Sequence, residues 1–376
     1  MFYEAPRHHN QKMKIYILVG TRPNFVKITQ FKHCAAKMYP HLKISVIHTG
    51  QHYDEKMADI FFRQFDLQPD EYLNISPVSP NRQIAEIMIG LEKLVEKIGK
   101  PDLFLVVGDV NSTLAGALFA NKCGIKLGHI EAGLRSFDKS MPEEQNRIIT
   151  DHLAELHFVT EPSGENNLRN EMRIPSGIHL VGNTMIDTLV AYQAGIKKSG
   201  ILGELKVEEN RFVLMTMHRP STVDSKATFE KLLELIDHIS QRYKIVFPVH
   251  PRTTRRADEF SLTDRILNNK SLICTSPLDY FAFQKLVSSC AFILTDSGGI
   301  QEEATYVRKP CLTLRSTTER PITIDEGTNT LLNFDLDSVK EYILQIESGS
   351  YKKGHIPKYW DGKATERILK IISDNA

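Results

Sequence analysis

The chain has 376 residues, 41% of them apolar and 25% charged, which is ordinary for a soluble globular protein and fits two domains. Its 47 basic and 46 acidic side chains leave a net charge of +1, which gives no electrostatic case for binding nucleic acid or an anionic membrane. No apolar run approaches the length that spans a bilayer, and five scattered cysteines without a CxxC motif favour free thiols in a reducing cytoplasm.

Short β-rich runs alternate along the chain with longer amphipathic stretches. Most of the short runs are continuously apolar, which is typical of parallel strands covered by helices on both faces. We expect strands at 15–19, 44–48, 103–107, 126–130, 156–159, 178–181, 212–216, 244–249, 272–274, 291–295 and 311–314. Helical patterns such as 82–98 and 228–242 lie between them. The sequence therefore predicts an α/β protein with open parallel sheets and right-handed crossovers.

The alternation predicts two doubly wound domains. Residues 1–13 are polar, lack the apolar core of a secretory signal, and are expected to form a flexible overhang. The first domain is expected at 14–190 and the second at 210–358, joined by a glycine-containing and charged linker at 191–209. The last helical stretch, within 359–376, is expected to cross back to the first domain.

Nearly every predicted strand ends in a polar cluster. In open α/β sheets, ligands bind outside the carboxyl ends of the strands. Two such edges facing each other would form an interdomain cleft lined with Arg, His, Asp and Glu side chains. The polar clusters therefore predict where the functional site lies.

The segment 292–304 is the most informative cluster, because an apolar run ends at Asp296 and is followed by Ser297, Gly298 and Gly299 and then by a helical pattern. A strand, a glycine turn and a helix start present backbone N–H groups to an anion. The two carboxylates in the first turns, Glu302 and Glu303, would repel a phosphate and suit hydroxyl groups such as those of a ribose. The alternative is an ordinary tight turn with an acidic first helical turn.

Cations follow the first predicted strand. Pro23 suits the start of a helix, which would place Arg22 at the helix mouth and Lys27 about one turn further on. This arrangement suits a diphosphate. The alternative is a capped helix with two solvated cations. The glycine spacing fits neither GxGxxG nor a Walker loop, which disfavours a nicotinamide or flavin dinucleotide.

Carboxylates and histidines follow further strands. Asp109 and Glu131 are expected at two strand ends of one sheet, and Glu143 at a helix start beside Glu144, which we interpret as a structural cap. Carboxylates that face one cleft suit proton transfer. His218 ends the first strand of the second domain. A histidine there is either a structural hydrogen-bonding group or a catalyst, and no HxxxH or Cys/His spacing supports a metal site.

The order of these clusters resembles one family. The motifs that carry the resemblance are GTRPNFVK, HTGQHYD, GDVNST, GHIEAGLRSFDKSMPEEQNR, VGNTMID, HRP, TDSGGIQEEA and TTERP. Together they resemble the non-hydrolysing UDP-N-acetylglucosamine 2-epimerases over nearly the whole chain. The resemblance implies a GT-B fold of two Rossmann-like domains whose parallel sheets face an interdomain cleft. It also implies a cytoplasmic homodimer that supplies precursors of surface polysaccharides.

The reaction implied by the resemblance interconverts UDP-N-acetylglucosamine and UDP-N-acetylmannosamine without a cofactor or a metal. UDP leaves together with the C2 proton, which gives a 2-acetamidoglucal, and then adds back with the opposite configuration at C2. The catalytic positions carried over by motif are Asp109, Glu131, Glu143 and His218. The positions carried over for UDP are Arg22, Lys27, Ser297, Gly298, Gly299, Glu303 on the ribose, and Arg320 as a weaker phosphate candidate.

The chain departs from the family pattern at several positions. Gln51 and His52 match a motif through which some bacterial members bind a second, activating substrate molecule, but Asp54 replaces its last glutamine. His250 stands in an altered histidine motif and joins Gln51 and His52 as a second-site candidate. Ile322 replaces a frequent glutamate. These differences leave open that the substrate carries a related sugar, such as a diacetamido-uronic acid. The motifs also leave open a GT-B glycosyltransferase, a hydrolysing epimerase and a non-catalytic sugar-nucleotide sensor.

Overall fold

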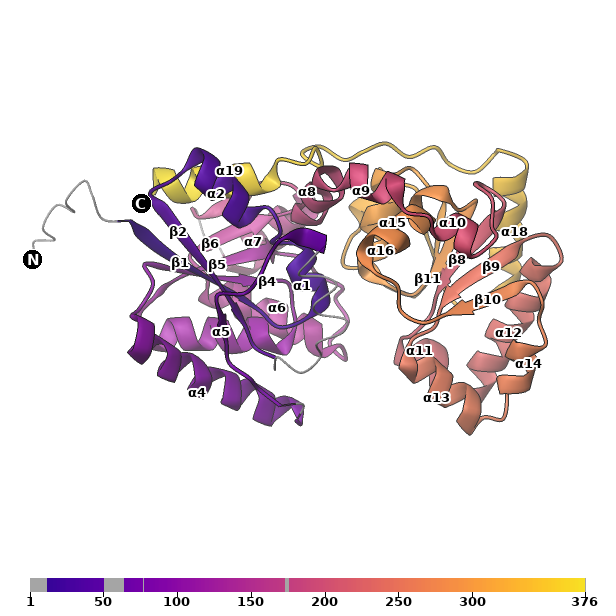
Figure 1. Ribbon diagram of the computed structural model, residues 1–376, viewed down its shortest axis with the longest axis horizontal. Helices are drawn as coiled ribbons and strands as arrows, with labels where there is room; N and C mark the ends of the chain where they lie inside the picture. The colour runs from indigo at the N-terminus through magenta and orange to yellow at the C-terminus, as the bar shows by residue number, and fades with distance from the viewer. Residues whose placement is uncertain (1–11, 51–63, 77, 173–175, 376) are drawn as a thin grey trace, which may run out of the picture. The chain divides into compact units, whose positions relative to one another are not determined.

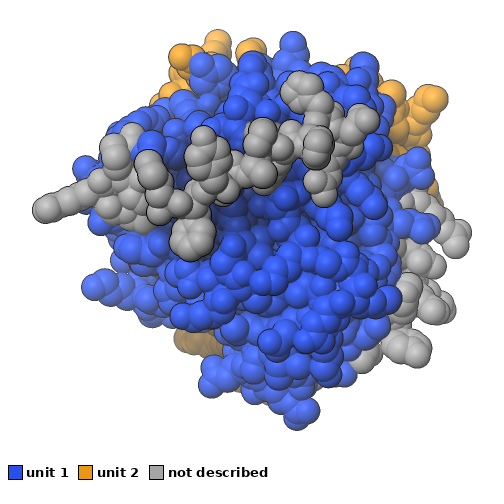
Figure 2. All heavy atoms as spheres, turned by 90° about the vertical axis from the view of Figure 1, so that its left-hand side faces the viewer, with its two compact units in different colours: residues 1–188, 359–376 blue, residues 189–358 orange. Residues whose placement is uncertain are grey.

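The computed structural model describes residues 12–50, 64–76, 78–172 and 176–375 (Figure 1). The contacts divide the chain into two compact units. Unit 1 is Met1–Thr188 with Tyr359–Ala376, and unit 2 is Leu189–Lys358. Figure 2 colours unit 1 blue and unit 2 orange. No helix in the described part of the chain has the length and apolar character that crossing a membrane would require.

Unit 1 is built on a sheet in the order β3-β2-β1-β4-β5-β6-β7, in which the neighbouring strands are parallel. The strands are β1 (Met13–Val19), β2 (Leu42–His48), β3 (Glu71–Tyr72), β4 (Leu103–Val107), β5 (Lys126–Ala132), β6 (Leu156–Val159) and β7 (Ile178–Leu180). All five residues of β4 are buried, as expected of a central strand that is covered on both faces. The strand order reverses between β1 and β4, which is where ligands bind in such sheets.

Helices cover both faces of this sheet, with α4 and α5 below it and α2 and α19 above it in Figure 1. Pro80 and Pro142 begin α4 and α6, where the missing N–H of proline leaves no hydrogen bond unmade. The helices are α1 (Arg22–Val26), α2 (Phe31–Met38), α4 (Pro80–Ile98), α5 (Asn111–Lys122), α6 (Pro142–Leu153), α7 (Pro162–Met172), α8 (Thr184–Ala191) and α19 (Ala364–Asp374).

Unit 2 is a second parallel sheet, in the order β10-β9-β8-β11-β12-β13. The strands are β8 (Phe212–Thr216), β9 (Lys244–Pro248), β10 (Leu272–Thr275), β11 (Phe292–Thr295), β12 (Cys311–Leu314) and β13 (Asn329–Leu332). The helices are α9 (Gln193–Lys198), α10 (Ile201–Glu204), α11 (Pro220–Val223), α12 (Lys226–Ser240), α13 (Pro251–Glu259), α14 (Thr263–Leu267), α15 (Tyr280–Ser289), α16 (Gly298–Tyr306), α17 (Ile322–Asp325) and α18 (Leu336–Glu347). The predicted α/β class with parallel sheets is confirmed.

The segment 359–376 packs within unit 1. The Trp360 indole N–H donates to the carbonyl of Thr160 at 3.2 Å. The carboxylate of Asp187 accepts from the N–H groups of Ala364 at 3.0 Å and Thr365 at 2.6 Å, which are otherwise unsatisfied donors at the start of α19. One buried carboxylate therefore fixes the start of the final helix.

Replacing Asp187 by alanine should loosen this segment. The change leaves two buried N–H groups without an acceptor, so we expect the free energy of unfolding of unit 1 to fall by about 2 kcal/mol or more. Because Trp360 is the single tryptophan and is buried, its fluorescence during urea unfolding is the measurement. The control is Asp374→Ala at the exposed end of α19, where we expect a change below about 0.5 kcal/mol. Equal losses in both variants would contradict the prediction.

Candidate active site

Glu131 lies at the end of β5 in an unusual backbone conformation. The pairing register with β6 shifts between Ile130 and Ala132, and Glu131 has φ of 71°, a left-handed value that few residues other than glycine adopt. Its side chain is buried and forms an ion pair with Lys27, which is also buried. A strained carboxylate at the end of a strand is typical of a functional position.

Gly108 makes room for this ion pair. It follows β4 with φ of 69°, and a Cβ atom there would lie 3.2 Å from both Glu131 Oε2 and Lys27 Nζ. The alternative interpretation of Lys27 as a solvated cation does not hold, because the ammonium is buried against Glu131. Arg22 begins helix α1, and Lys27 follows the last residue of that helix.

Asp109 follows Gly108 and is oriented by helix α6. Arg147 Nε donates to Asp109 Oδ2 at 3.0 Å, and Asn146 donates to the carbonyl of Asp109 at 2.9 Å. The side chain of Asp109 remains about a quarter exposed. Its carboxylate is thus held in place and still accessible to a ligand.

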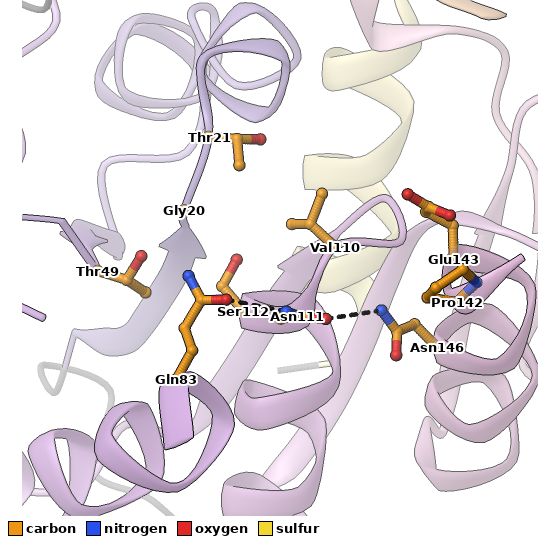
Figure 3. Close-up of a pocket in the computed structure, with 10 residues that line it drawn as sticks. All are labelled: Gly20, Thr21, Thr49, Gln83, Val110, Asn111, Ser112, Pro142, Glu143 and Asn146. Carbon is orange, nitrogen blue, oxygen red and sulfur yellow. Dashed lines mark hydrogen bonds between the residues drawn. The ribbon is translucent and has the colours of Figure 1, made fainter. Parts of the chain in front are cut away.

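Glu143 lines a pocket of about 240 Å³ at the same end of the sheet (Figure 3). The close-up shows Asn111 between Gln83 and Asn146, with hydrogen bonds of 2.9 and 3.4 Å. Within the described ranges of the chain, the side chain of Glu143 makes no hydrogen bond or ion pair, and the residue is partly exposed. The other lining residues are Gly20, Thr21, Thr49, Val110, Ser112 and Pro142.

Glu144 serves the structure instead. Its buried carboxylate accepts from the N–H groups of Ser136 at 2.9 Å and Phe137 at 2.8 Å, and it forms an ion pair with Arg147. These contacts fix the loop between β5 and α6. The Ser136 hydroxyl donates to the same carboxylate at 2.9 Å, so Glu144, although adjacent to Glu143 in sequence, is already bound by four donors.

In unit 2, His218 and Asp296 follow the neighbouring parallel strands β8 and β11. The buried Asp296 carboxylate accepts from the N–H groups of His218 at 2.9 Å and Arg219 at 2.8 Å, and its Oδ1 lies 3.0 Å from His218 Nδ1. Burial acts to raise the pKa of Asp296, but the His218 ring and these N–H groups bring that pKa below its ordinary value. An ionised Asp296 orients the half-exposed His218 ring so that Nε2 is the nitrogen left for a ligand.

His250 packs beside this pair. Its ring centroid is 5.6 Å from that of His218, and its Nδ1 accepts from the N–H of Arg252 at 3.1 Å at the start of α13. Burial lowers the pKa of His250, and the positive charges of His218 and Arg252 lower it further. The other two second-site candidates, Gln51 and His52, lie outside the described residues.

Ser297 precedes α16, whose first residues are Gly298 and Gly299. A Cβ atom at Gly298 would lie 2.6 Å from Glu319 Oε1 and 2.7 Å from Arg320 Nη1. A larger residue at 298 would therefore displace the ends of these two side chains. The motif alone does not reveal this close contact.

Arg320 is buried and bound by two carboxylates. Its guanidinium forms ion pairs with Glu302 at 2.9 Å and with Glu319. Glu319 also lies 2.9 Å from Arg315, and burial lowers the pKa of Arg315 despite that partner. The arginine proposed for phosphate therefore belongs to a compensated charge cluster beside the start of α16.

Glu303 lies on α16, and its carboxylate is bound by another residue of unit 2. Gln284 on α15 donates to its Oε1, and the charge of Glu303 adds to burial in raising the pKa of Tyr280 well above its ordinary value. Gln284 and Arg147 support these carboxylates and were not predicted from the sequence. The spacing of three between Glu144 and Arg147 on a predicted helix could have indicated the latter.

Two doubly wound units with polar residues at the carboxyl ends of their strands define a nucleotide-binding α/β protein of the GT-B class. A sequence model of the family described as UDP-N-acetylglucosamine 2-epimerase matches residues 35–373. The chain belongs to this epimerase family, and its class of enzyme is the isomerases. Among the described residues, no group of three or more His, Cys, Asp or Glu side chains is arranged to hold a metal ion.

Individual relatives match over almost the full length. The chain is 41% identical to the UDP-N-acetylglucosamine 2-epimerase of Methanococcus maripaludis, covering 96% of this chain and 98% of that protein. It is 32% identical to the UDP-2,3-diacetamido-2,3-dideoxy-D-glucuronate 2-epimerase of Pseudomonas aeruginosa, covering 96% and 99%. The crystal structure of the Methanocaldococcus jannaschii enzyme in complex with UDP-GlcNAc and UDP superposes with a TM-score of 0.87 at 37% identity, covering 96% and 100%.

The same substitution at two adjacent residues of α6 should change stability by very different amounts. Glu144→Gln removes a charge that satisfies buried donors, so we expect the free energy of unfolding to fall by about 2 kcal/mol. Glu143→Gln, which breaks no interaction among the described residues, should change it by less than about 0.5 kcal/mol. Urea unfolding followed by circular dichroism compares the two variants. A larger loss for Glu143→Gln would contradict the assignment of Glu144 as the structural acid.

Proposed function

We propose that the chain interconverts UDP-N-acetylglucosamine and UDP-N-acetylmannosamine by eliminating UDP and adding it back. The observation that carries this proposal is the strained, buried Glu131 paired with Lys27, at the same sheet end as Asp109 and the uncommitted Glu143. A GT-B glycosyltransferase would need a groove for its acceptor in place of three carboxylates around the sugar. Membership of the epimerase family supports the same reaction.

The chemistry explains why both acids and cations are needed. The C2 proton of the sugar is not adjacent to a carbonyl group, so it becomes acidic only as the bond between the anomeric carbon and the diphosphate breaks. The enzyme must therefore stabilise the departing diphosphate and the positive charge on the sugar in one transition state. We propose that Asp109, Glu131 and Glu143 stabilise the sugar cation and exchange the C2 proton.

The departing diphosphate needs positive charge and N–H donors, which the cations and the start of α16 supply. We propose that Arg22, Lys27 and His218 stabilise the diphosphate, with the N–H groups of Ser297, Gly298 and Gly299. The contact of His218 with ionised Asp296 supports this role, because it leaves Nε2 for a phosphate oxygen. Arg320 would act at longer range from its ion pairs. Glu303 would accept from the ribose hydroxyls, since Gln284 already holds its carboxylate in place.

We also propose that the enzyme is a homodimer in the cytoplasm. The five cysteines are free, which suits a reducing compartment. Light scattering coupled to gel filtration measures the mass of the assembly.

Isotope exchange should reveal the reaction. In deuterium oxide, breaking and remaking the C2–H bond places solvent deuterium at C2 of UDP-N-acetylglucosamine, and NMR of the anomeric and C2 signals should follow this together with the appearance of UDP-N-acetylmannosamine. UDP-2,3-diacetamido-2,3-dideoxy-D-glucuronate is the comparison substrate, because one relative of this chain is named as the 2-epimerase of that sugar. Turnover to another product without deuterium at C2 would identify a transferase or hydrolase instead.

The acids of unit 1 should be needed for turnover. Replacing Glu131 with glutamine, or Asp109 with asparagine, removes a proton acceptor, so we expect kcat to fall by about a hundredfold or more. The control is Glu165→Gln. The Glu165 carboxylate forms a surface ion pair with Arg169, so this change should leave kcat within about twofold. Coupled assay of UDP-N-acetylmannosamine formation gives the rates. A Glu131→Gln enzyme within a few fold of the unaltered rate would remove Glu131 from the mechanism.

A further inference from the structure

Helix α6 presents three charged residues at intervals of four, Glu143, Arg147 and Asp151, which places them on one face of the helix. Glu143 lines the pocket and Arg147 holds the carboxylate of Asp109. Asp151, the last of the three, is fully buried and contacts β5 and the residues that follow it. Its role is not explained by the proposed catalytic set.

The Asp151 carboxylate contacts residues on both sides of Glu131 in the sequence. Its Oδ1 lies 2.6 Å from Nδ1 of His129, and its Oδ2 accepts from the N–H of Gly133 at 3.1 Å and from Arg135 at 2.7 Å. Residues 129 and 133 stand two places before and two places after Glu131. One carboxylate therefore holds both sides of the bulge that turns Glu131 into its left-handed conformation.

His129 continues the chain of contacts to the other acid. Its Nε2 lies 2.8 Å from the carbonyl oxygen of Gly108, the residue before Asp109. A carbonyl oxygen and an ionised carboxylate are acceptors only. Both ring nitrogens of His129 therefore face acceptors, which is the arrangement in which an imidazolium ion would donate on both sides.

The charges around this ion balance. Burial acts to raise the pKa of Asp151, but His129 and Arg135 bring it below its ordinary value, so Asp151 is ionised. Arg135 also pairs with Glu171 at 2.7 Å, which gives two cations and two anions in the cluster. His157 lies against the backbone carbonyl of Asp151 at 2.8 Å, and burial lowers its pKa, which keeps it neutral.

We propose that Asp151 and His129 form a buried ion pair that positions both Glu131 and Asp109 for exchange of the C2 proton, an inference that rests on the proposed epimerase reaction. The two residues are positioning residues, because their contacts are to β5, the following loop and the carbonyl of Gly108. The ion pair links the ends of β4 and β5, so the two acids keep a fixed spacing while the sugar changes shape.

The test combines kinetics with the protonation state of one ring. In Asp151→Asn the ion pair is lost, so we expect kcat to fall by about a hundredfold through misplacement of the acids while KM changes less than about threefold. Glu171→Gln alters the same charge cluster on its outer, partly exposed side and should leave kcat within about twofold. Imidazole ¹⁵N spectra should show His129 protonated on both nitrogens at neutral pH in the unaltered enzyme and on one nitrogen in Asp151→Asn. The signal is assigned by its loss in His129→Gln.

Distinct outcomes overturn the distinct claims. A singly protonated His129 in the unaltered enzyme removes the ion pair, whatever the activity. A folded Asp151→Asn enzyme that keeps its kcat removes the positioning role. If Asp151→Asn does not fold, His129→Gln replaces it, because the glutamine amide can donate to Gly108 without a charge and should show the same loss of kcat. If the unaltered enzyme epimerises no UDP-sugar, the proposed reaction fails, while the spectrum still decides whether the ion pair exists.

Discussion

The ion pair between Glu131 and Lys27 lies directly against Gly108. A Cβ atom of residue 108 would lie 3.2 Å from both charged groups, and both groups are buried. Burying two charges costs free energy unless they are paired closely and held by further contacts. The left-handed backbone at Glu131 adds to that cost. The surrounding network of unit 1 is therefore the part of the fold that makes this arrangement stable.

The charged side chains of the two units are neutralised by different kinds of partner. In unit 1, acids at the ends of β4 and β5 are each bound to a basic side chain that comes from a helix or from a helix end, as Arg147 binds Asp109. In unit 2, Asp296 is satisfied mainly by backbone N–H groups and by His218, while Arg320 is neutralised by Glu302 and Glu319. Unit 1 thus offers carboxylates suited to proton transfer, and unit 2 offers donors suited to an anion.

The sequence predicted the class of fold well because the central strands are continuous apolar runs, such as the wholly buried β4. It missed β3, which has two residues, and β13, which begins with Asn329 and Thr330, because neither shows an apolar run. Local patterns also placed Asp109 and Glu131 at strand ends. They could not reveal that Lys27 is buried against Glu131, because that pair joins residues far apart in sequence and depends on the backbone at Gly108.

The division of the chain has a consequence for its synthesis. Along the sequence, unit 2 interrupts unit 1. The part of unit 1 that follows it is the short C-terminal segment that contains α19 and Trp360. Protein synthesis runs from the N-terminus, and domains generally fold as units while the chain emerges from the ribosome. Unit 2 is therefore complete before the last piece of unit 1 has been translated. Until α19 emerges, the carboxylate of Asp187 has no helix to cap, and the apolar surface that α19 covers must remain open to solvent or to a chaperone.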